Sequence, residues 1–248
     1  MASVGNCCPT VNPKTNRKAR QNATARTGCT ALLLALFGLA QAQDDGRRFK
    51  LTPLDEMTPA QRVVADNIRS GPRAAVAGSA ANASTTTLGS PFNVWLRSPE
   101  LADQLQKLGA QIRFKSSLSP RLNEFAILIT ARHWTSQYEW FAHHRLALQA
   151  GLSPQVADAV AQGRRPDTLQ PDEEAVYEFT RELHTQQRVA DATYQRALAQ
   201  FGEQGVVDLI AVTGYYVLVS MTLNVDRTPV PGGNPVLLPP LAQPLPLR

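Results

Sequence analysis

The stretch Ser119-Pro-Arg-Leu-Asn-Glu-Phe-Ala-Ile-Leu-Ile-Thr-Ala-Arg132 decides the fold class. Serine followed by proline is typical of a helix N-terminus, because the serine side chain caps the first turn and proline fits the first helical position. Apolar residues then follow at three- and four-residue intervals: Leu122, Phe125, Ala126 and Ile129. This spacing places them on one face of a helix, and we predict a largely buried helix here.

Similar signals recur along the chain, while strand signals are nearly absent. Ser98-Pro99 and Ser153-Pro154 each precede an apolar helical pattern, and Thr58-Pro59-Ala60-Gln61 has the form of a capping box. We therefore predict an all-α, single-domain bundle of about eight helices. The predicted ranges are 58–70, 98–112, 119–132, 136–150, 153–162, 171–183, 191–202 and 205–224.

The remaining segments have other compositions. Residues 43–54 are predicted to be an exposed lead-in, and residues 74–91, rich in Ala, Ser, Thr and Gly, a long loop of the kind that is often functional. Residues 205–224 are the most apolar, which indicates a central helix or one buried in an oligomer interface. A membrane span fits poorly there because several polar residues interrupt the segment. Residues 228–248 contain seven prolines and are predicted to form an extended tail.

The first 42 residues have the three parts of a secretory signal peptide. They carry five Lys or Arg residues and no acid, then the ten-residue apolar run Thr30–Leu39, then Ala40-Gln41-Ala42. An organelle transit peptide and a buried helix are the alternatives. With cleavage after Ala42, we expect an exported protein, periplasmic or secreted, with no membrane partner after cleavage.

Cleavage would change the chemistry that the composition allows. The chain has 25 basic and 20 acidic residues, so losing five basic ones leaves 20 of each. The net charge of +5, which suggests a polyanion partner, then disappears, and we expect no nucleic-acid partner. All three cysteines, Cys7, Cys8 and Cys29, precede the cleavage point, so thiol chemistry is excluded from the mature protein.

A pair of residues in the predicted helix 136–150 has the spacing of an acid–base site. Glu139 and His143 are four residues apart, so their side chains share a helical face and can touch. A carboxylate beside an imidazole fixes its tautomer and raises its basicity, as proton transfer requires. The alternative is a surface ion pair. Glu124, in the predicted buried helix, is either a third member of the site or a first-turn acid favoured by the helix dipole.

Several segments together carry a family resemblance. The motifs are Arg121-x-x-Glu124-x-x-Ile127-Leu128, Tyr138-Glu139-Trp140-x-x-His143 and Ala150-Gly151-Leu152. The chain resembles the carboxymuconolactone decarboxylase family, within the all-helical superfamily that also contains alkylhydroperoxidase D. The resemblance covers roughly residues 51–231, and we assign the helical domain to residues 55–227. The peroxidase branch has a Cys-x-x-Cys pair where this chain has Ser136 and Glu139, so thiol peroxidase activity is not expected.

The resemblance implies a lyase that works without a metal or an organic cofactor. The substrate would be a small carboxylated lactone or related acid, and the enzyme a carboxy-lyase. On this interpretation His143 transfers the proton, Glu139 orients the His143 ring, and Glu124 completes the proton relay. A bound metal is not expected, since Glu139 and His143 supply only two nearby ligands.

Other residues are candidates for the pocket wall. Arg132 or Arg145 is predicted to hold a substrate carboxylate, because the guanidinium geometry suits one. Tyr138 and Trp140 are predicted to contact the substrate. Isomerisation or hydrolysis with the same residues remains open, as does a different class, a non-enzymatic helical binding or assembly protein. The resemblance also implies a homo-oligomer, as a dimer, trimer or hexamer.

Overall fold

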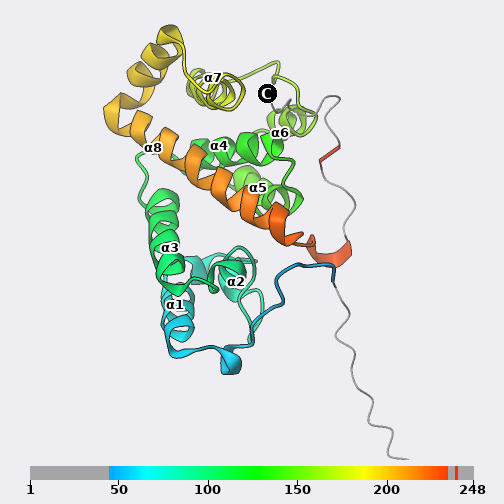
Figure 1. Cartoon of the computed structure of the whole chain (residues 1–248). Helices are drawn as coiled ribbons and strands as arrows, with labels where there is room; N and C mark the ends of the chain where they lie inside the picture. The colour runs from blue at the N-terminus through cyan, green and yellow to red at the C-terminus, as the bar shows by residue number, and fades with distance from the viewer. Residues whose placement is uncertain (1–44, 234–237, 240–248) are drawn as a thin grey trace, which may run out of the picture. The chain divides into compact units, whose positions relative to one another are not determined.

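The computed structural model describes residues 45–233 and 238–239. The predicted signal peptide lies outside the described residues, as do residues 234–237 and 240–248 of the predicted tail. The described part of the chain contains helices and no β-strand, apart from one isolated bridge between Pro53 and Thr87. All of it belongs to one compact unit (Figure 1). The predicted all-α, single-domain bundle is confirmed.

Eight α-helices are present in the described residues. They are α1 (Pro59–Ser70), α2 (Phe92–Trp95), α3 (Pro99–Phe114), α4 (Pro120–His133), α5 (Gln137–Gln149), α6 (Pro154–Ala161), α7 (Pro171–Gln186) and α8 (Asp191–Asp226). The short α2 was not predicted. The predicted helices 191–202 and 205–224 are two parts of α8, which bends at Gly202, where φ is +67°.

The helix boundaries follow the sequence signals in most places. Thr58 and Gln61 form the predicted capping box, and the Ser119 side chain accepts a hydrogen bond from the Leu122 amide. Gly151 ends α5 with a φ of +97°, a left-handed conformation that glycine adopts without strain. Ser98 precedes α3 without a side-chain capping bond, so proline at the first position is enough to start that helix.

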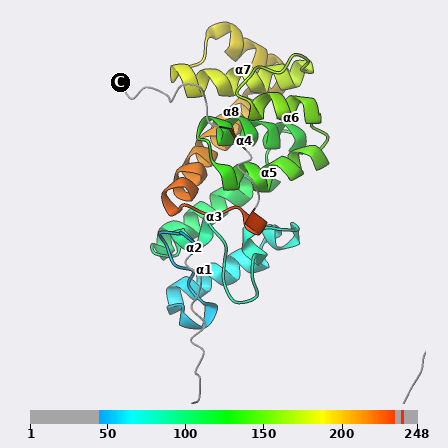
Figure 2. The same ribbon diagram turned by 90° about the vertical axis from the view of Figure 1, so that its right-hand side faces the viewer.

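Helix α4 lies at the centre of the packing. Every residue from Leu122 to Arg132 is buried, and α4 packs against α5, α6, α7 and α8. Figures 1 and 2 show α4 to α7 grouped together, with α8 crossing them and α3 standing beside α1 and α2. Helix α4, which the sequence predicts to be largely buried, therefore forms the core against which α5, α6, α7 and α8 pack.

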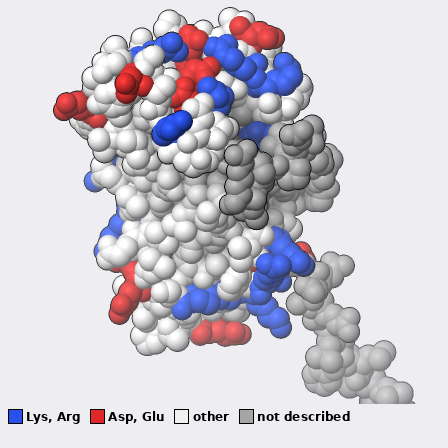
Figure 3. Space-filling view, turned by 45° about the horizontal axis from the view of Figure 1, so that its top comes forward, with Lys and Arg blue, Asp and Glu red and all other residues white. Residues whose placement is uncertain are grey.

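Helix α8 is apolar on both its inner and its outer face. It alone among the described helices is long and apolar enough to cross a membrane, yet 56% of its most apolar window is buried within the protein. Its outer face exposes five large apolar residues: Val207, Ile210, Leu218, Met221 and Val225. Figure 3 shows one face of the molecule, where charged side chains lie mainly near the two ends and leave a broad uncharged region between them.

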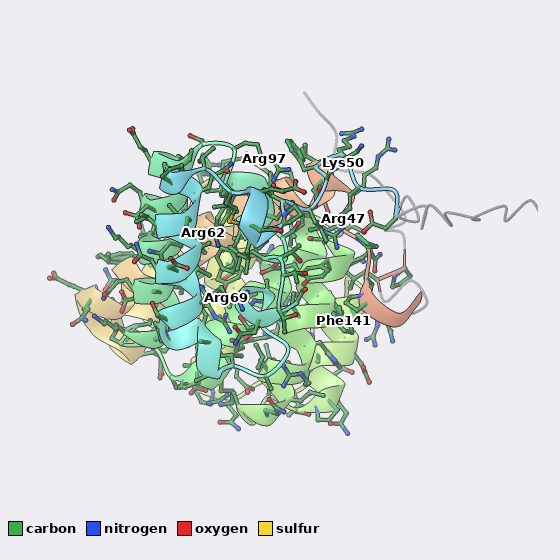
Figure 4. All side chains as sticks on the ribbon, turned by 90° about the horizontal axis from the view of Figure 1, so that it is seen from below. Arg47, Lys50, Arg62, Arg69, Arg97 and Phe141 are labelled. Atoms are coloured by element: carbon green, nitrogen blue, oxygen red, sulfur yellow. The ribbon has the colours of Figure 1, made fainter. Side chains whose placement is uncertain are left out.

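The segment before α1, predicted to be an exposed lead-in, has no buried residue in its described part, 45–54, and yet makes specific contacts with the helices. The Phe49 amide donates to the buried Asp226 carboxylate at 3.1 Å, and the Ser90 hydroxyl donates to the same carboxylate at 2.7 Å. The Arg97 guanidinium lies over the Phe49 ring, 5.7 Å from its centre. Figure 4 shows Arg47, Lys50 and Arg97 close together at this end of the molecule. Asp226 thus joins the lead-in and the predicted 74–91 loop to the end of α8.

Candidate active site

Three of the predicted site residues meet at the contact between α4 and α5. Glu124 comes from the second turn of α4, and Glu139 and His143 come from one face of α5. All three are buried, with exposed fractions of 8%, 3% and 6% respectively. A surface ion pair and an exposed first-turn acid, the alternatives considered from sequence, do not describe these residues.

The His143 imidazole lies between the two carboxylates. Its Nδ1 atom is 2.6 Å from Glu124 Oε2, a hydrogen bond, and its Nε2 atom is 3.3 Å from Glu139 Oε1. Glu139 Oε1 is buried and has no hydrogen-bond partner among the described residues. One ring nitrogen is therefore fixed by Glu124, while the other faces a carboxylate that retains unused hydrogen-bonding capacity.

Burial makes ionisation of the Glu139 carboxyl unfavourable. Desolvation raises the pKa of Glu139 above its usual range, and the nearby charges of His143 and Arg113 offset only part of this effect. Tyr216, whose ring stands edge-on to the His143 ring at 5.0 Å, has its pKa raised well above the usual value, also by burial. The site therefore favours a protonated carboxyl group and a neutral phenol beside the imidazole.

Two arginines that were not predicted lie at this site. Arg113, near the end of α3, has its Nη2 atom 3.8 Å from Glu124 Oε1. Arg73, from the 3-10 turn Pro72–Ala75, is 3% exposed and lies over the Phe92 ring, 5.3 Å from its centre. Both come from segments distant in sequence from α4 and α5, and no spacing or motif in the sequence links them to Glu139.

A small cavity opens beside these groups, and we call it the acid–base cavity. Its volume is about 70 Å³. Its lining includes Arg73, Arg113, Tyr138, Glu139, His143 and Tyr215. Part of its wall is the segment 76–80 from the predicted 74–91 loop. Glu124 is not part of the lining and lies behind the imidazole.

The other predicted contact residues have different positions. Tyr138 and Arg145 line the acid–base cavity, but the Arg145 guanidinium donates to the Ala77 carbonyl at 2.6 Å and to Gln149 at 3.0 Å. Trp140 is buried against the core, with its ring stacked on His144 at 5.6 Å. Arg132 lines a different cavity, between α4 and α7. The structure therefore brings Arg73 and Arg113, and not Arg132, to the acid–base cavity.

The remaining histidines also have defined surroundings. His133 and His184 stack on each other, with ring centres 4.4 Å apart, away from the acid–base cavity. Among the described residues, no group of three His, Cys, Asp or Glu side chains is arranged to hold a metal ion.

Comparison with known proteins adds no further assignment. No protein-family model matches the chain, and no curated protein matches it in sequence.

Proposed function

We propose that the protein is an acid–base enzyme that acts on a small carboxylated substrate without a cofactor, as a decarboxylase of the carboxymuconolactone decarboxylase type. The observation that supports this most directly is the placement of His143 between two buried carboxylates at the edge of a cavity. Two arginines, Arg73 and Arg113, line the same cavity. A buried acid with a raised pKa beside an imidazole, at a cavity, is typical of a proton-transfer site, and Glu139 has these properties.

The contacts favour a division of roles that differs from the one expected from sequence. Glu124 bonds to His143 Nδ1 from behind, so it is the residue that orients the ring and fixes its tautomer. Glu139 lines the cavity, so its carboxyl group is placed to exchange a proton with the substrate, while its buried Oε1 atom faces His143 Nε2. His143 Nε2, 3.3 Å from Glu139, returns that proton.

A decarboxylation can be written with these groups. The bond between the α-carbon and the leaving carboxylate breaks, CO₂ departs, and the electron pair moves into the conjugated carbonyl as an enolate. The guanidinium groups of Arg73 and Arg113 stabilise that negative charge. The protonated Glu139 carboxyl then donates its proton to carbon, and His143 reprotonates it with a proton taken up from solvent, so that each turnover consumes one proton. A positioned acid of this kind contributes about 10²- to 10⁴-fold to a rate.

The cavity dimensions bear on substrate size. A volume of about 70 Å³ holds a carboxyl group and its neighbouring atoms. A larger lactone ring would extend past the segment 76–80, which forms part of the wall. The proposed substrates are therefore small, and their reacting end enters first.

The test is CO₂ release from 4-carboxymuconolactone and from other small carboxylated lactones. We expect His143→Ala and Glu139→Gln to lower kcat by about 10²- to 10⁴-fold. Glu182→Gln is the matched control, because Glu182 is a buried carboxylate of α7 that bonds to Thr193 and the Ala190 amide. Unchanged rates in the two site variants would rule out the assigned roles. The same variants tested on related isomerisation and hydrolysis substrates separate those reactions from decarboxylation.

We also propose that the protein forms a homo-oligomer. Oligomer formation is equally expected for the alternative class, a non-enzymatic binding or assembly protein. The exposed apolar residues of α8 include Val207 at 62% and Val225 at 51% exposure, and a row of such residues along a helix is typical of an interface. We propose a homo-oligomer, as a dimer, trimer or hexamer. Light scattering of the wild type and of Ile210→Glu tests this, with a smaller species expected for the variant. An oligomer that turns over none of the substrates would favour a binding or assembly protein.

We also propose export through the leader at residues 1–42. Cell fractionation followed by mass spectrometry of the intact protein tests this. A periplasmic or secreted species that begins at Gln43 is expected. A cytoplasmic species that retains the leader would contradict export.

A further inference from the structure

A second cavity lies between α4 and α7, and we call it the α4–α7 cavity. Its volume is about 180 Å³, well above the roughly 30 Å³ that one water molecule occupies in the liquid. Its lining includes Arg132, His133, Val160, Tyr177, Arg181 and His184. It shares no lining residue with the acid–base cavity.

The two cavities lie on different sides of α4. His133 follows Glu124 by nine positions, which at about 100° per residue places it on roughly the opposite face of the helix. Glu124 faces His143 of α5, whereas His133 stacks on His184 of α7. A ligand in the α4–α7 cavity therefore does not compete directly for the groups of the acid–base cavity.

The unusual group in this cavity is the Arg132 side chain. The residue is only 4% exposed, and none of its three guanidinium nitrogens has a hydrogen-bond partner among the described residues. Leaving a buried charge unpaired is costly, and such charges in proteins are paired with an opposite charge or a ligand. Arg132 thus carries five N–H donors in a fixed plane, and none of them is paired with an acceptor of the described residues.

The surroundings of Arg132 favour an anion. Arg164 and Arg181 line the same cavity, and Arg181 is already paired with Glu178 at 2.8 Å. Burial lowers the pKa of both His133 and His184, that of His184 to about 3, so the two imidazoles are neutral at neutral pH. The positive charge available to a ligand therefore resides on the guanidinium groups.

The rest of the wall is apolar or aromatic. Ile129, Val160 and Tyr177 contribute side chains to it, while Gly163, Arg164 and Thr185 are exposed and lie where the cavity meets the surface. Inorganic anions would leave the apolar part of this wall uncovered. An organic acid satisfies both parts, because its carboxylate can pair with a guanidinium in bidentate fashion while its body covers apolar surface.

We propose that the α4–α7 cavity is a second binding site, for a small organic carboxylate whose anionic end pairs with Arg132 and whose apolar body rests on Val160 and Tyr177. This proposal does not depend on the function proposed for the acid–base cavity.

The chain has four histidines, and they allow the two cavities to be observed separately. His133 and His184 line the α4–α7 cavity, and His143 lines the acid–base cavity. The experiment is NMR of the full chain with ¹³C-labelled histidine rings, titrated with benzoate and, separately, with the neutral analogue benzyl alcohol. We expect saturable shifts of the His133 and His184 signals with benzoate and none with benzyl alcohol.

Variants then test the role of Arg132. Arg132→Lys keeps the charge but loses the bidentate geometry, and should weaken benzoate binding measured at His133 and His184 by at least about tenfold. Arg196→Lys, an exposed arginine of α8, is the matched control and should bind as the wild type does. Equal affinity in Arg132→Lys would overturn the proposal. If Arg132→Lys does not fold, the proposal is decided by the wild-type protein titrated with benzoate and with benzyl alcohol. No shift of the His133 and His184 signals with benzoate, or equal shifts with benzyl alcohol, would also overturn the proposal.

Discussion

His143 Nδ1 and Glu124 Oε2 lie 2.6 Å apart, and this hydrogen bond connects the face of α5 that carries the site to the buried helix α4. Glu124 makes the bond from the side opposite to the acid–base cavity, which it does not line. The arrangement separates an orienting carboxylate, Glu124, from one that faces the cavity, Glu139. Orientation and proton exchange can therefore be tested independently.

Glu124→Gln tests the orienting role. The amide can still occupy the space, but it cannot hold the imidazole through a charged acceptor, so we expect kcat to fall by about 10²-fold. KM should stay near the wild-type value because Glu124 does not contact the cavity. Steady-state kinetics measure both, with Glu182→Gln as the control. A folded Glu124→Gln variant with unchanged kcat would argue against orientation by Glu124.

Whether a residue of this site can be predicted from sequence depends on the sequence separation between that residue and its contact partners. Glu139 and His143 are four residues apart on one helix, so helical geometry alone predicts that they meet. The participation of Glu124 requires the packing of α4 on α5, which local spacing does not determine. Arg73 and Arg113 depend on where the segments that carry them fold back, so tertiary contacts alone reveal them.

The same distinction applies to the fold. Proline at the first helical position and the apolar spacing predict the starts of seven of the eight described helices, because both signals act within one or two turns. The four-residue α2 is too short to have an apolar period of its own. Asp226 holds Ser90 and Phe49 across long sequence separations, so the attachment of the lead-in has no local signal.

Glu139→Gln should change the pH dependence of stability. Burial raises the pKa of Glu139 in the folded protein above the ordinary 4.5. At pH values between the pKa of the unfolded state and the higher pKa of the folded state, the folded protein binds more protons than the unfolded protein. The contribution of Glu139 to the free energy of unfolding therefore falls as pH rises. Glutamine does not ionise, and the variant should therefore gain stability relative to the wild type as pH increases through this window.

Urea unfolding at a series of pH values measures this difference. Asp103→Asn provides a control of opposite sign, because the hydrogen bond from Lys107 lowers the pKa of Asp103. The stability that Asp103 contributes is present above its unfolded pKa and is lost as pH falls, so its variant should approach the wild type in acid. A difference between Glu139→Gln and the wild type that does not vary with pH would contradict a raised pKa at Glu139.

Gly109→Ala should displace side chains that line the acid–base cavity, although Gly109 itself is not a lining residue. A Cβ atom at this position of α3 would overlap the Tyr215 hydroxyl and the Arg73 Nη2 atom. Both side chains line the acid–base cavity, so the substitution should displace them, lower kcat/KM, and destabilise the protein by about 1–3 kcal/mol.

Gly214→Ala is the matched control for that substitution. Gly214 also lies inside a helix, and within a single chain a Cβ atom there would have no neighbour within 4 Å. The position is four residues from Ile210 and from Leu218, on the face proposed for oligomer contacts, so light scattering must first show the wild-type assembly state. In that state alanine should raise stability by about 0.5–1 kcal/mol and leave activity unchanged. Thermal unfolding and kinetics of both variants decide the point. If Gly109→Ala behaves like Gly214→Ala, the close approach of α3 to Arg73 and Tyr215 does not matter for the site.

Arg145→Met tests whether the wall formed by segment 76–80 controls access to the cavity. The Arg145 guanidinium donates to the Ala77 carbonyl at 2.6 Å and so attaches this wall to α5. Without that bond, the segment should exchange its amide hydrogens faster and close over the substrate less often, so we expect KM to rise several-fold with a smaller change in kcat. Hydrogen exchange and steady-state kinetics measure the two effects, with Arg196→Met as an exposed control. A large loss of kcat at unchanged KM would instead indicate that Arg145 contacts the reacting group.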